Sequence, residues 1–222
     1  MLIIGAGGLG CPAALYLASS GVGRITIADA DKVDLTNLQR QILYRAASVG
    51  DRTVDAARGA LAAINPGVEV VALAERVDEA CASSLVAAAD VVLDCSDNFA
   101  TRHALNRACA THRKPLVSGA AIRFDGQVSV FDRRRDDAPC YACLFPEDGD
   151  AEEVQCAVMG VLAPLTGLVG ALQAIEAIKL IAGIGETLAG RLLMVDALGA
   201  GFRSVRIARD PECAVCARSG AR

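Results

Sequence analysis

The sequence predicts an α/β fold, a Rossmann-like, doubly wound and mostly parallel sheet that antiparallel strands continue in the C-terminal half. Over residues 1–124, apolar runs typical of buried strands alternate with helical patterns, as in a sheet covered by helices on both faces. Beyond residue 124, strand-like runs instead flank one long helical pattern. Two pairs of closely spaced cysteines in this second half add a structural zinc site. We therefore expect one domain over residues 1–222, made of the halves 1–124 and 125–222.

The chain opens with a strand, a tight glycine turn and a helix. The apolar run 2–4 predicts the strand, Gly5-Ala6-Gly7-Gly8-Leu9-Gly10 the turn, and residues 11–18 the helix. Glycines let the backbone approach a phosphate, and the first free amides of the helix supply donors. Asp29 ends the next apolar run, where its carboxylate can accept a hydrogen bond from a ribose hydroxyl. The pattern indicates a nucleotide site, although a simple tight turn gives the same spacing.

The remaining elements follow from hydrophobic period and turn residues. In the first half we expect helices over 52–64, 79–88 and 101–112 and strands over 68–73, 91–94 and 115–118. In the second half we expect strands over 126–131, 191–196 and 202–207 around a helix over 168–181. The apolar stretch 158–184 contains Glu176 and Lys179, whose charges are costly in lipid, so it predicts a buried helix and no membrane span.

Composition and charge narrow the class of protein. The chain of 222 residues is 53% hydrophobic, which is ample for a large core. Its formal net charge of −4 argues against a nucleic-acid partner held by a broad basic surface. The apolar opening is interrupted by glycines and lacks a basic leader, so we expect no signal peptide and a cytoplasmic location.

The nine cysteines fall into three groups. Cys140 with Cys143, and Cys213 with Cys216, form two Cys-x-x-Cys knuckles whose thiolates match a tetrahedral zinc site, with a redox pair or two disulfides as alternatives. Four others lie in helical or strand patterns and are expected to be small buried residues: Cys11, Cys81, Cys95 and Cys109. Cys156 follows an acidic stretch, 146–153, that predicts a flexible loop.

Several ordered motifs together resemble one family. They are Gly5-Ala6-Gly7-Gly8-Leu9-Gly10, Asp29-Ala30-Asp31-Lys32-Val33, Thr36-Asn37-Leu38-Gln39-Arg40-Gln41 and Asp94-Cys95-Ser96-Asp97-Asn98. With the run 115–121 and both cysteine knuckles, they resemble the ThiF/MoeB/HesA adenylyltransferases, the bacterial relatives of ubiquitin-activating enzymes. The resemblance covers essentially the whole chain, and the branch that serves molybdopterin synthesis is the nearest in pattern.

The resemblance implies a reaction, its cofactors and its partners. The cofactors are ATP, Mg²⁺ and a structural Zn²⁺, and the partners are a second copy of the chain in a homodimer and a small ubiquitin-like sulfur-carrier protein ending in two glycines. The carrier's terminal carboxylate attacks the α-phosphorus of ATP and pyrophosphate leaves, in a molybdopterin, thiamine or thiolation pathway. Nucleotide binding falls to residues 1–124, and carrier and zinc binding to 125–222. Because the carboxylate is already ionised, the site must supply positive charge and alignment and needs no general base.

The resemblance also implies roles for individual residues. It makes Gly8 the closest backbone approach, Asp29 the ribose contact and Arg40 the phosphate contact, and Asp97 binds magnesium. The other nucleotide-binding positions are Thr36, Asn37, Leu38, Gln39, Thr53 and Asn98. Cys156 matches a loop cysteine that attacks the acyl-adenylate in some relatives, although acidic neighbours oppose a reactive thiolate. By residue type alone, Asn37 and Arg40 also fit a solvated turn with a capping Asn, and Asp97 also fits a helix N-cap.

Two departures from the family pattern keep other functions open. Thr53 stands where the family has a lysine that contacts the ATP phosphates, and a threonine supplies no charge there. The family's N-terminal helical segment, with an arginine that reaches the partner subunit's site, is expected to be absent. A degenerate relative that only binds ATP or the carrier is therefore one alternative. An NAD-dependent dehydrogenase is a weaker one, because His103 and His112 share one helical pattern and suggest no hydride site.

Overall fold

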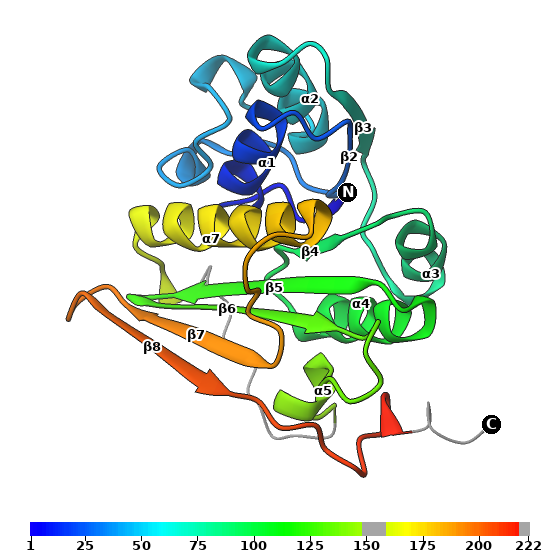
Figure 1. The fold of residues 1–222 in the computed structure, drawn as a ribbon. Coiled ribbons are helices and arrows are strands. Elements are labelled where there is room, and N and C mark those ends of the chain that lie inside the picture. The colour runs from blue at the N-terminus through cyan, green and yellow to red at the C-terminus, as the bar shows by residue number, and fades with distance from the viewer. Residues whose placement is uncertain (148–158, 218–222) are drawn as a thin grey trace.

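Eight strands form one sheet, in the order β3-β2-β1-β4-β5-β6-β7-β8, in the computed structural model, which describes residues 1–147 and 159–217 (Figure 1). The strands are β1 (Leu2–Ile4), β2 (Arg24–Ala28), β3 (Glu69–Leu73), β4 (Val92–Asp94), β5 (Pro115–Ile122), β6 (Asp125–Asp132), β7 (Arg191–Asp196) and β8 (Gly201–Arg206). The first five pair in parallel, and β6, β7 and β8 continue the sheet in antiparallel register. The predicted fold class is confirmed.

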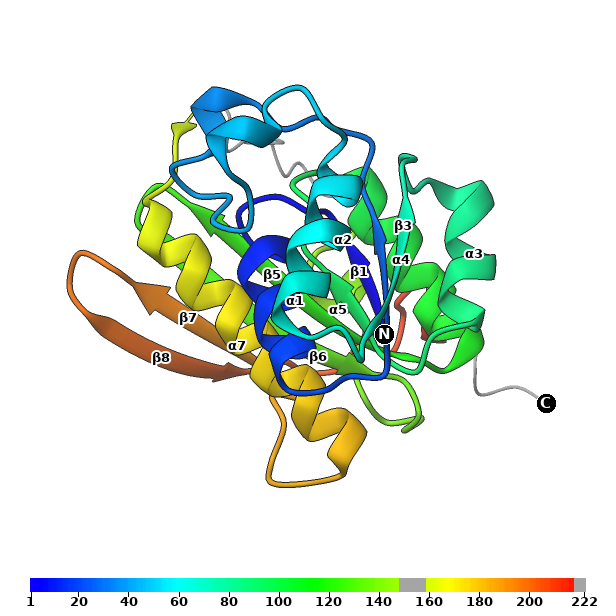
Figure 2. The ribbon, with the colours of Figure 1, turned by 90° about the horizontal axis from the view of Figure 1, so that it is seen from above.

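Helices cover both faces of this sheet. They are α1 (Gly10–Ser19), α2 (Thr53–Ile64), α3 (Glu79–Ala87), α4 (Phe99–His112), α5 (Tyr141–Leu144) and α7 (Ala163–Ala182), with short 3₁₀ helices η1 (Leu35–Asn37) and η2 (Ala46–Ser48). Residues of α1, α2 and α7 share one apolar core with the sheet, and residues of α3, α4 and α5 share a second core on the opposite face (Figure 2). The strand order reverses between β1 and β4, which is where open α/β sheets bind ligands.

The strand β5 is twice as long as the pattern predicts. It runs on to Ile122 because β6 pairs with all of it, from Pro115 opposite Asp132 to Ile122 opposite Asp125. The turn between the two strands includes Arg123, whose φ of 49° lies in the left-handed region. Small residues such as Gly119 gave no strand signal on their own, so the partner strand and not local propensity defines this element.

The long helix α7 is fixed to β4 and β5 by one buried side chain. The side chain of Gln173 is fully buried and its Nε2 donates to the carbonyl oxygens of Asp94, at 2.7 Å, and Val117, at 3.2 Å. Glu176, 4% exposed, accepts a 2.7 Å bond from the amide of Leu188 and pairs with Lys179. By length and composition α7 could cross a membrane, and 44% of its apolar window is buried within the fold.

The crossing of α1 and α7 requires glycine. A Cβ added at Gly170 would lie 2.4 Å from the carbonyl oxygen of Leu9 and 2.5 Å from Cγ of Pro12, closer than real contacts allow. Within the turn before α1, a Cβ at Gly10 would lie 1.9 Å from the carbonyl oxygen of Gly5. These close approaches seat α7 directly behind the glycine turn.

Replacing Gly170 by alanine should therefore destabilise the fold by about 1–3 kcal/mol, since the new methyl group overpacks the helix crossing. Gly167→Ala is the matched control: it lies in the same helix and its Cβ would meet nothing within 4 Å. The control should gain up to about 1 kcal/mol from helix propensity. Urea denaturation of both variants checks this, and equal midpoints would contradict it.

Candidate nucleotide site and metal site

A cavity of about 320 Å³ lies at the C-terminal ends of β1, β2 and β4. It is lined by six of the predicted nucleotide-binding residues, which are Gly8, Asp29, Asn37, Arg40, Asp97 and Asn98. The four other predicted positions, Thr36, Leu38, Gln39 and Thr53, are not among its lining residues. The cavity thus gathers residues from the glycine turn, from the segment after β2 and from the segment after β4.

The carboxylate of Asp29 ties the glycine turn to its neighbours. Its Oδ2 accepts a 2.6 Å bond from the amide of Ala6, and its Oδ1 accepts a 2.7 Å bond from the amide of Asp31. Thr53, only 1% exposed, places its Oγ1 3.1 Å from Asp29 Oδ1 and 3.1 Å from the carbonyl oxygen of Asp31. The hydroxyl of Thr53 therefore orients Asp29 from behind and does not face the cavity.

Arg40 is aimed at the glycine turn by a capped 3₁₀ turn. Asp34 accepts a 2.8 Å bond from the amide of Thr36, so Asp34 is the cap and the alternative of a capping Asn37 is wrong. The backbone of Asn37 then accepts a 3.1 Å bond from the amide of Arg40. A Cβ added at Gly8 would lie 3.3 Å from Cδ of Arg40, which places the stem of Arg40 over that glycine.

Of the neighbours Asp97 and Asn98, one lines the cavity and the other caps the helix α4. Asn98 is the N-cap of α4 and accepts a 2.8 Å bond from the amide of Thr101, so the N-cap alternative for Asp97 is wrong. Asp97 is exposed and lines the cavity. A carboxylate in this position suits Mg²⁺, which takes one or two carboxylates and completes its shell with phosphate and water oxygens.

Carboxylates crowd this end of the sheet. Burial raises the pKa of Asp31, and the negative charges of Asp29 and Asp97 raise it further, while the guanidinium of Arg76 opposes the shift. A cavity that concentrates negative charge in this way accommodates an anionic nucleotide only together with cations. Three arginines line it among the described residues, Arg40, Arg76 and Arg102.

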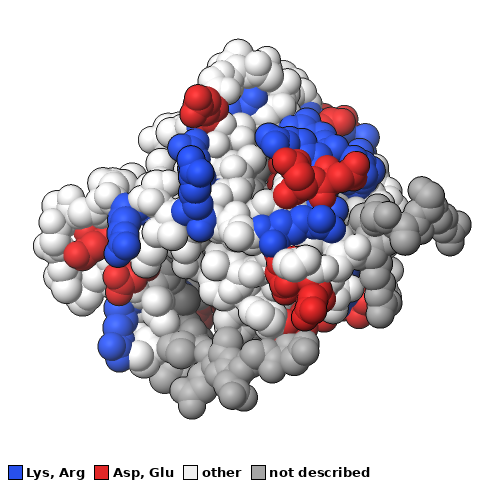
Figure 3. All heavy atoms as spheres, turned by 60° about the horizontal axis from the view of Figure 1, so that its bottom comes forward, with Lys and Arg blue, Asp and Glu red and all other residues white. Residues whose placement is uncertain are grey.

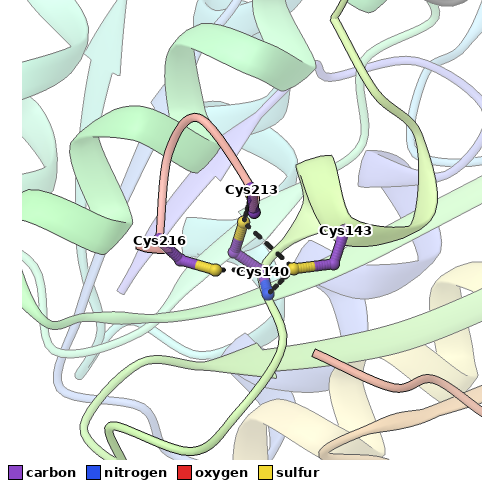
Figure 4. Close-up of side chains that lie close together, drawn as sticks. All are labelled: Cys140, Cys143, Cys213 and Cys216. Carbon is purple, nitrogen blue, oxygen red and sulfur yellow. Dashed lines mark hydrogen bonds between the residues drawn. The ribbon is translucent and has the colours of Figure 1, made fainter. Parts of the chain in front are cut away.

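The four knuckle cysteines meet at one point, where the start of α5 faces the segment after β8 (Figure 4). Their sulfur atoms lie within 4.8 Å of one another, with 3.6 Å between Cys140 and Cys213 and 3.4 Å between Cys143 and Cys216. A tetrahedral zinc with Zn–S bonds of about 2.3 Å separates its sulfurs by about 3.8 Å, whereas a disulfide needs about 2.05 Å. The geometry fits zinc and does not fit a pair of disulfides.

The surroundings of the cysteines also suit a metal. The hydrogen bond between the two thiols lowers the pKa of Cys143 and raises that of Cys140, so Cys143 is the readily ionised member of this pair. Asn106 approaches the sulfur of Cys140 with its Nδ2 at 3.6 Å and accepts a 2.9 Å bond from the amide of Tyr141. Arg209 donates a 2.9 Å bond to the carbonyl oxygen of Cys216. These bonds orient the ligands and bring a positive charge beside them.

Comparison with known proteins decides the family, because the ThiF family model matches residues 1–215. The chain belongs to the ThiF family. It is 47% identical over 216 residues to molybdopterin-synthase adenylyltransferase of Escherichia coli K12, covering 97% of this chain and 86% of that protein. It is 46% identical over 218 residues to adenylyltransferase and sulfurtransferase MOCS3 of Bos taurus, covering 97% of this chain but 48% of that protein.

A solved structure of E. coli MccB with ATP is similar in fold to this ThiF-family chain. The TM-score is 0.85 at 23% identity, and the match covers 97% of this chain and 66% of that one. At this identity the likeness establishes the shared architecture alone.

Among the other cysteines of this ThiF-family chain, Cys11, Cys95 and Cys109 are buried as predicted, and Cys81 is not. Cys81 is partly exposed because it lies in the first turn of α3, where its sulfur accepts a 3.4 Å contact from the amide of Asp78. Burial raises the pKa of Cys11 to about 12, so this thiol stays protonated beneath the glycine turn. Cys156 lies outside the described residues.

A second cavity of about 610 Å³ adjoins the nucleotide cavity and was not predicted. Its walls come from β5, β6, β7 and β8 and from the start of α4, and its apolar side chains are Phe99, Ile122, Met194, Val195 and Phe202. Both cavities are lined by Asp97, Asn98, Arg102 and Ala121, so the two spaces meet there. Sequence reasoning missed this cavity because its walls come together only through the pairing of four strands.

The cysteine geometry predicts one zinc ion per chain. Cys213→Ala should lose most of its zinc and unfold more easily, because the loss of one of four thiolates weakens a structural zinc site whose binding energy contributes to folding. Cys109→Ala, a buried cysteine on α4 outside the cluster, should keep the metal. Elemental analysis together with thermal unfolding checks this. Wild-type protein without zinc, or zinc retained by Cys213→Ala, would refute the assignment.

Proposed function

We propose that this chain is an adenylyltransferase that uses ATP to activate the C-terminal carboxylate of a small ubiquitin-like sulfur-carrier protein ending in two glycines. The main support is the cavity in which the glycine turn, Arg40 and Asp97 converge, in a chain 47% identical to a molybdopterin-synthase adenylyltransferase. One oxygen of the carrier's carboxylate attacks the α-phosphorus of ATP. The bond from that phosphorus to the bridging oxygen breaks, and pyrophosphate leaves with its electron pair.

The residues of the nucleotide cavity divide this work. Gly5, Gly7, Gly8 and Leu9 of the glycine turn line the cavity, and Gly8 would allow the phosphates to approach the backbone there. Arg40 contributes positive charge next to the turn, and Asp29, fixed by Thr53, is placed for the ribose. Asp97 would hold Mg²⁺, which neutralises phosphate charge when it is bound. No proton needs to be removed, because the attacking carboxylate is ionised at neutral pH.

The second cavity is proposed to receive the extended tail of the carrier. It opens beside the nucleotide cavity, so a tail lying along β6 and β7 would present its end to the α-phosphate. Glycines at the end of the tail fit a passage that side chains would block. The pathway that the carrier serves is proposed to be that of molybdopterin, thiamine or thiolation.

A degenerate relative that binds ATP or the carrier without reaction is the second candidate. It is favoured by one observation: the hydroxyl of Thr53 is directed to Asp29, so this position adds no cation to the cavity. The dehydrogenase alternative has no such support. His103 packs edge-on against Tyr141 and His112 contacts Ser83, and neither histidine lines the nucleotide cavity.

The wider assignments rest on the same proposal. We propose one adenylation domain, since a single sheet runs through both halves, and a homodimer that covers the exposed apolar side chains Leu168, Ile175 and Ile181 of α7. The face drawn in Figure 3 carries basic and acidic side chains side by side, which favours protein partners over nucleic acid there. The cytoplasmic location stays a prediction.

Wild-type protein should catalyse ATP–pyrophosphate exchange that depends on a carrier ending in Gly-Gly. Arg40→Ala should lower the exchange rate about 100-fold or more, because a preorganised cation next to the phosphates is lost. Asp97→Ala should have a similar effect through loss of the magnesium ligand. Arg58→Ala, an exposed arginine on α2 paired with Asp55, is the control and should exchange normally.

Thr53→Lys distinguishes the two candidates. Exchange by the wild type decides for the active enzyme, and exchange that appears only after lysine is introduced decides for the degenerate relative. Full activity in both Arg40→Ala and Asp97→Ala would contradict the proposed site.

A further inference from the structure

One positively charged side chain lies at the junction between the two cavities. Among the described residues, the nucleotide cavity is lined by the cations Arg40, Arg76 and Arg102, and the second cavity by Arg102 and Arg203. Arg102 is therefore the cation that both cavities share. It extends from the first turn of α4, close to the N-cap Asn98.

Arg102 is held in place from several sides. Its Nη2 donates to the carbonyl oxygen of Ser96 at 2.9 Å and lies 3.5 Å from that of Gly119. Its Nε lies 4.0 Å from Oδ2 of Asp94, and its guanidinium carbon lies 5.9 Å from the ring centre of Phe99. A side chain fixed in this way loses little conformational freedom when a ligand binds to it.

Asp94 is the anchor of this arrangement. It is fully buried, and a buried carboxylate needs hydrogen bonds and a nearby positive charge. Ser96 donates to its Oδ1 through the hydroxyl at 2.6 Å, and Ser118 donates to its Oδ2 at 3.0 Å. Asp94 in β4 thus contacts Ser118 in β5 and lies close to Arg102 in α4. The position of Arg102 is therefore fixed by the two strands.

The chemistry at the junction calls for such a cation. In the proposed reaction, a carboxylate must approach the α-phosphate of ATP, and two anions repel each other. The lining of the second cavity also contains the carboxylates of Asp97, Asp125 and Asp196. A tail carboxylate therefore passes three carboxylates as well as Arg203 to reach the nucleotide, and the guanidinium of Arg102 at the junction offsets the repulsion there.

We propose that Arg102 binds the terminal carboxylate of the carrier and thereby selects a chain end that is a free acid. The inference rests on the proposed function and deepens it, because it assigns a residue to the second substrate. Arg40 and Asp97 act on the nucleotide, whereas Arg102 acts on the carboxylate. Asp94 is a positioning residue that acts through Arg102.

The test compares two forms of one probe, a ubiquitin-fold carrier protein prepared with its Gly-Gly end as the acid and as the amide. Binding of each form is measured by calorimetry at a saturating concentration of a non-hydrolysable ATP analogue. Wild-type protein should bind the acid about tenfold or more tightly than the amide. Arg102→Gln should reduce this ratio to near one, and Arg102→Lys should give an intermediate value.

The ratio of the two affinities cancels general damage to the fold, because a disturbed cavity weakens both forms alike. Arg107→Gln is the matched control: Arg107 lies on the same helix, pairs with Glu79 and Glu147, and lines neither cavity. It should leave the ratio at its wild-type value. An acid preference that survives in Arg102→Gln, or is absent from the wild type, overturns the inference.

A second measurement, pyrophosphate release by the wild type with the acid form, tests the adenylyltransferase activity separately from the role of Arg102. Release together with an acid preference independent of Arg102 leaves the adenylyltransferase standing and removes the role of Arg102. A wild type that binds neither form of the carrier and releases no pyrophosphate overturns both.

Discussion

The carboxylate of Asp29 is the interaction on which the nucleotide cavity depends. It joins the glycine turn, the segment after β2 and the start of α2 through bonds from Ala6, Asp31 and Thr53. An unpaired buried amide in the glycine turn would cost about 1–3 kcal/mol, so these bonds fix the turn before any ligand arrives. Thr53 belongs to this network, because its hydroxyl donates to Asp29 Oδ1 and so helps to orient that carboxylate.

Much of the parallel half could be predicted because its signals are local. Glycine at 5, 7, 8 and 10 and the aspartate after β2 determine the turn and the strand within a single unit. The antiparallel half was predicted less fully. The end of β5 has small residues with no strand pattern, and the first turn of α7 precedes Gly167 and Gly170, which interrupt the helical signal. In both places a distant partner and not the local sequence defines the element.

The candidate site shows the same division. Arg40 and Asp97, which the family resemblance singled out within short motifs, both line the nucleotide cavity. Arg102 and the second cavity were missed, because their surroundings come from β4, β5, β7 and α4 and no motif brings these together. Thr36, Leu38 and Gln39 belong to the motif that the resemblance assigned to nucleotide binding, yet only Asn37 and Arg40 of that motif's first five residues line the cavity, because consecutive residues in a tight turn point in different directions.

A metal bound by the four cysteines would close a large ring in the polypeptide chain. Cys140 and Cys213 are 73 positions apart, and the segment between them contains α7, β7 and β8. A metal that joins its two ends closes a ring, and by loop-closure entropy a ring of this size disfavours the unfolded chain by about 4 kcal/mol. Two walls of the second cavity lie within that ring, whereas the glycine turn and β1 to β4 lie outside it. Loss of the metal would therefore release α7, β7 and β8 from this constraint directly, whereas the glycine turn and β1 to β4 would feel it only through the shared sheet.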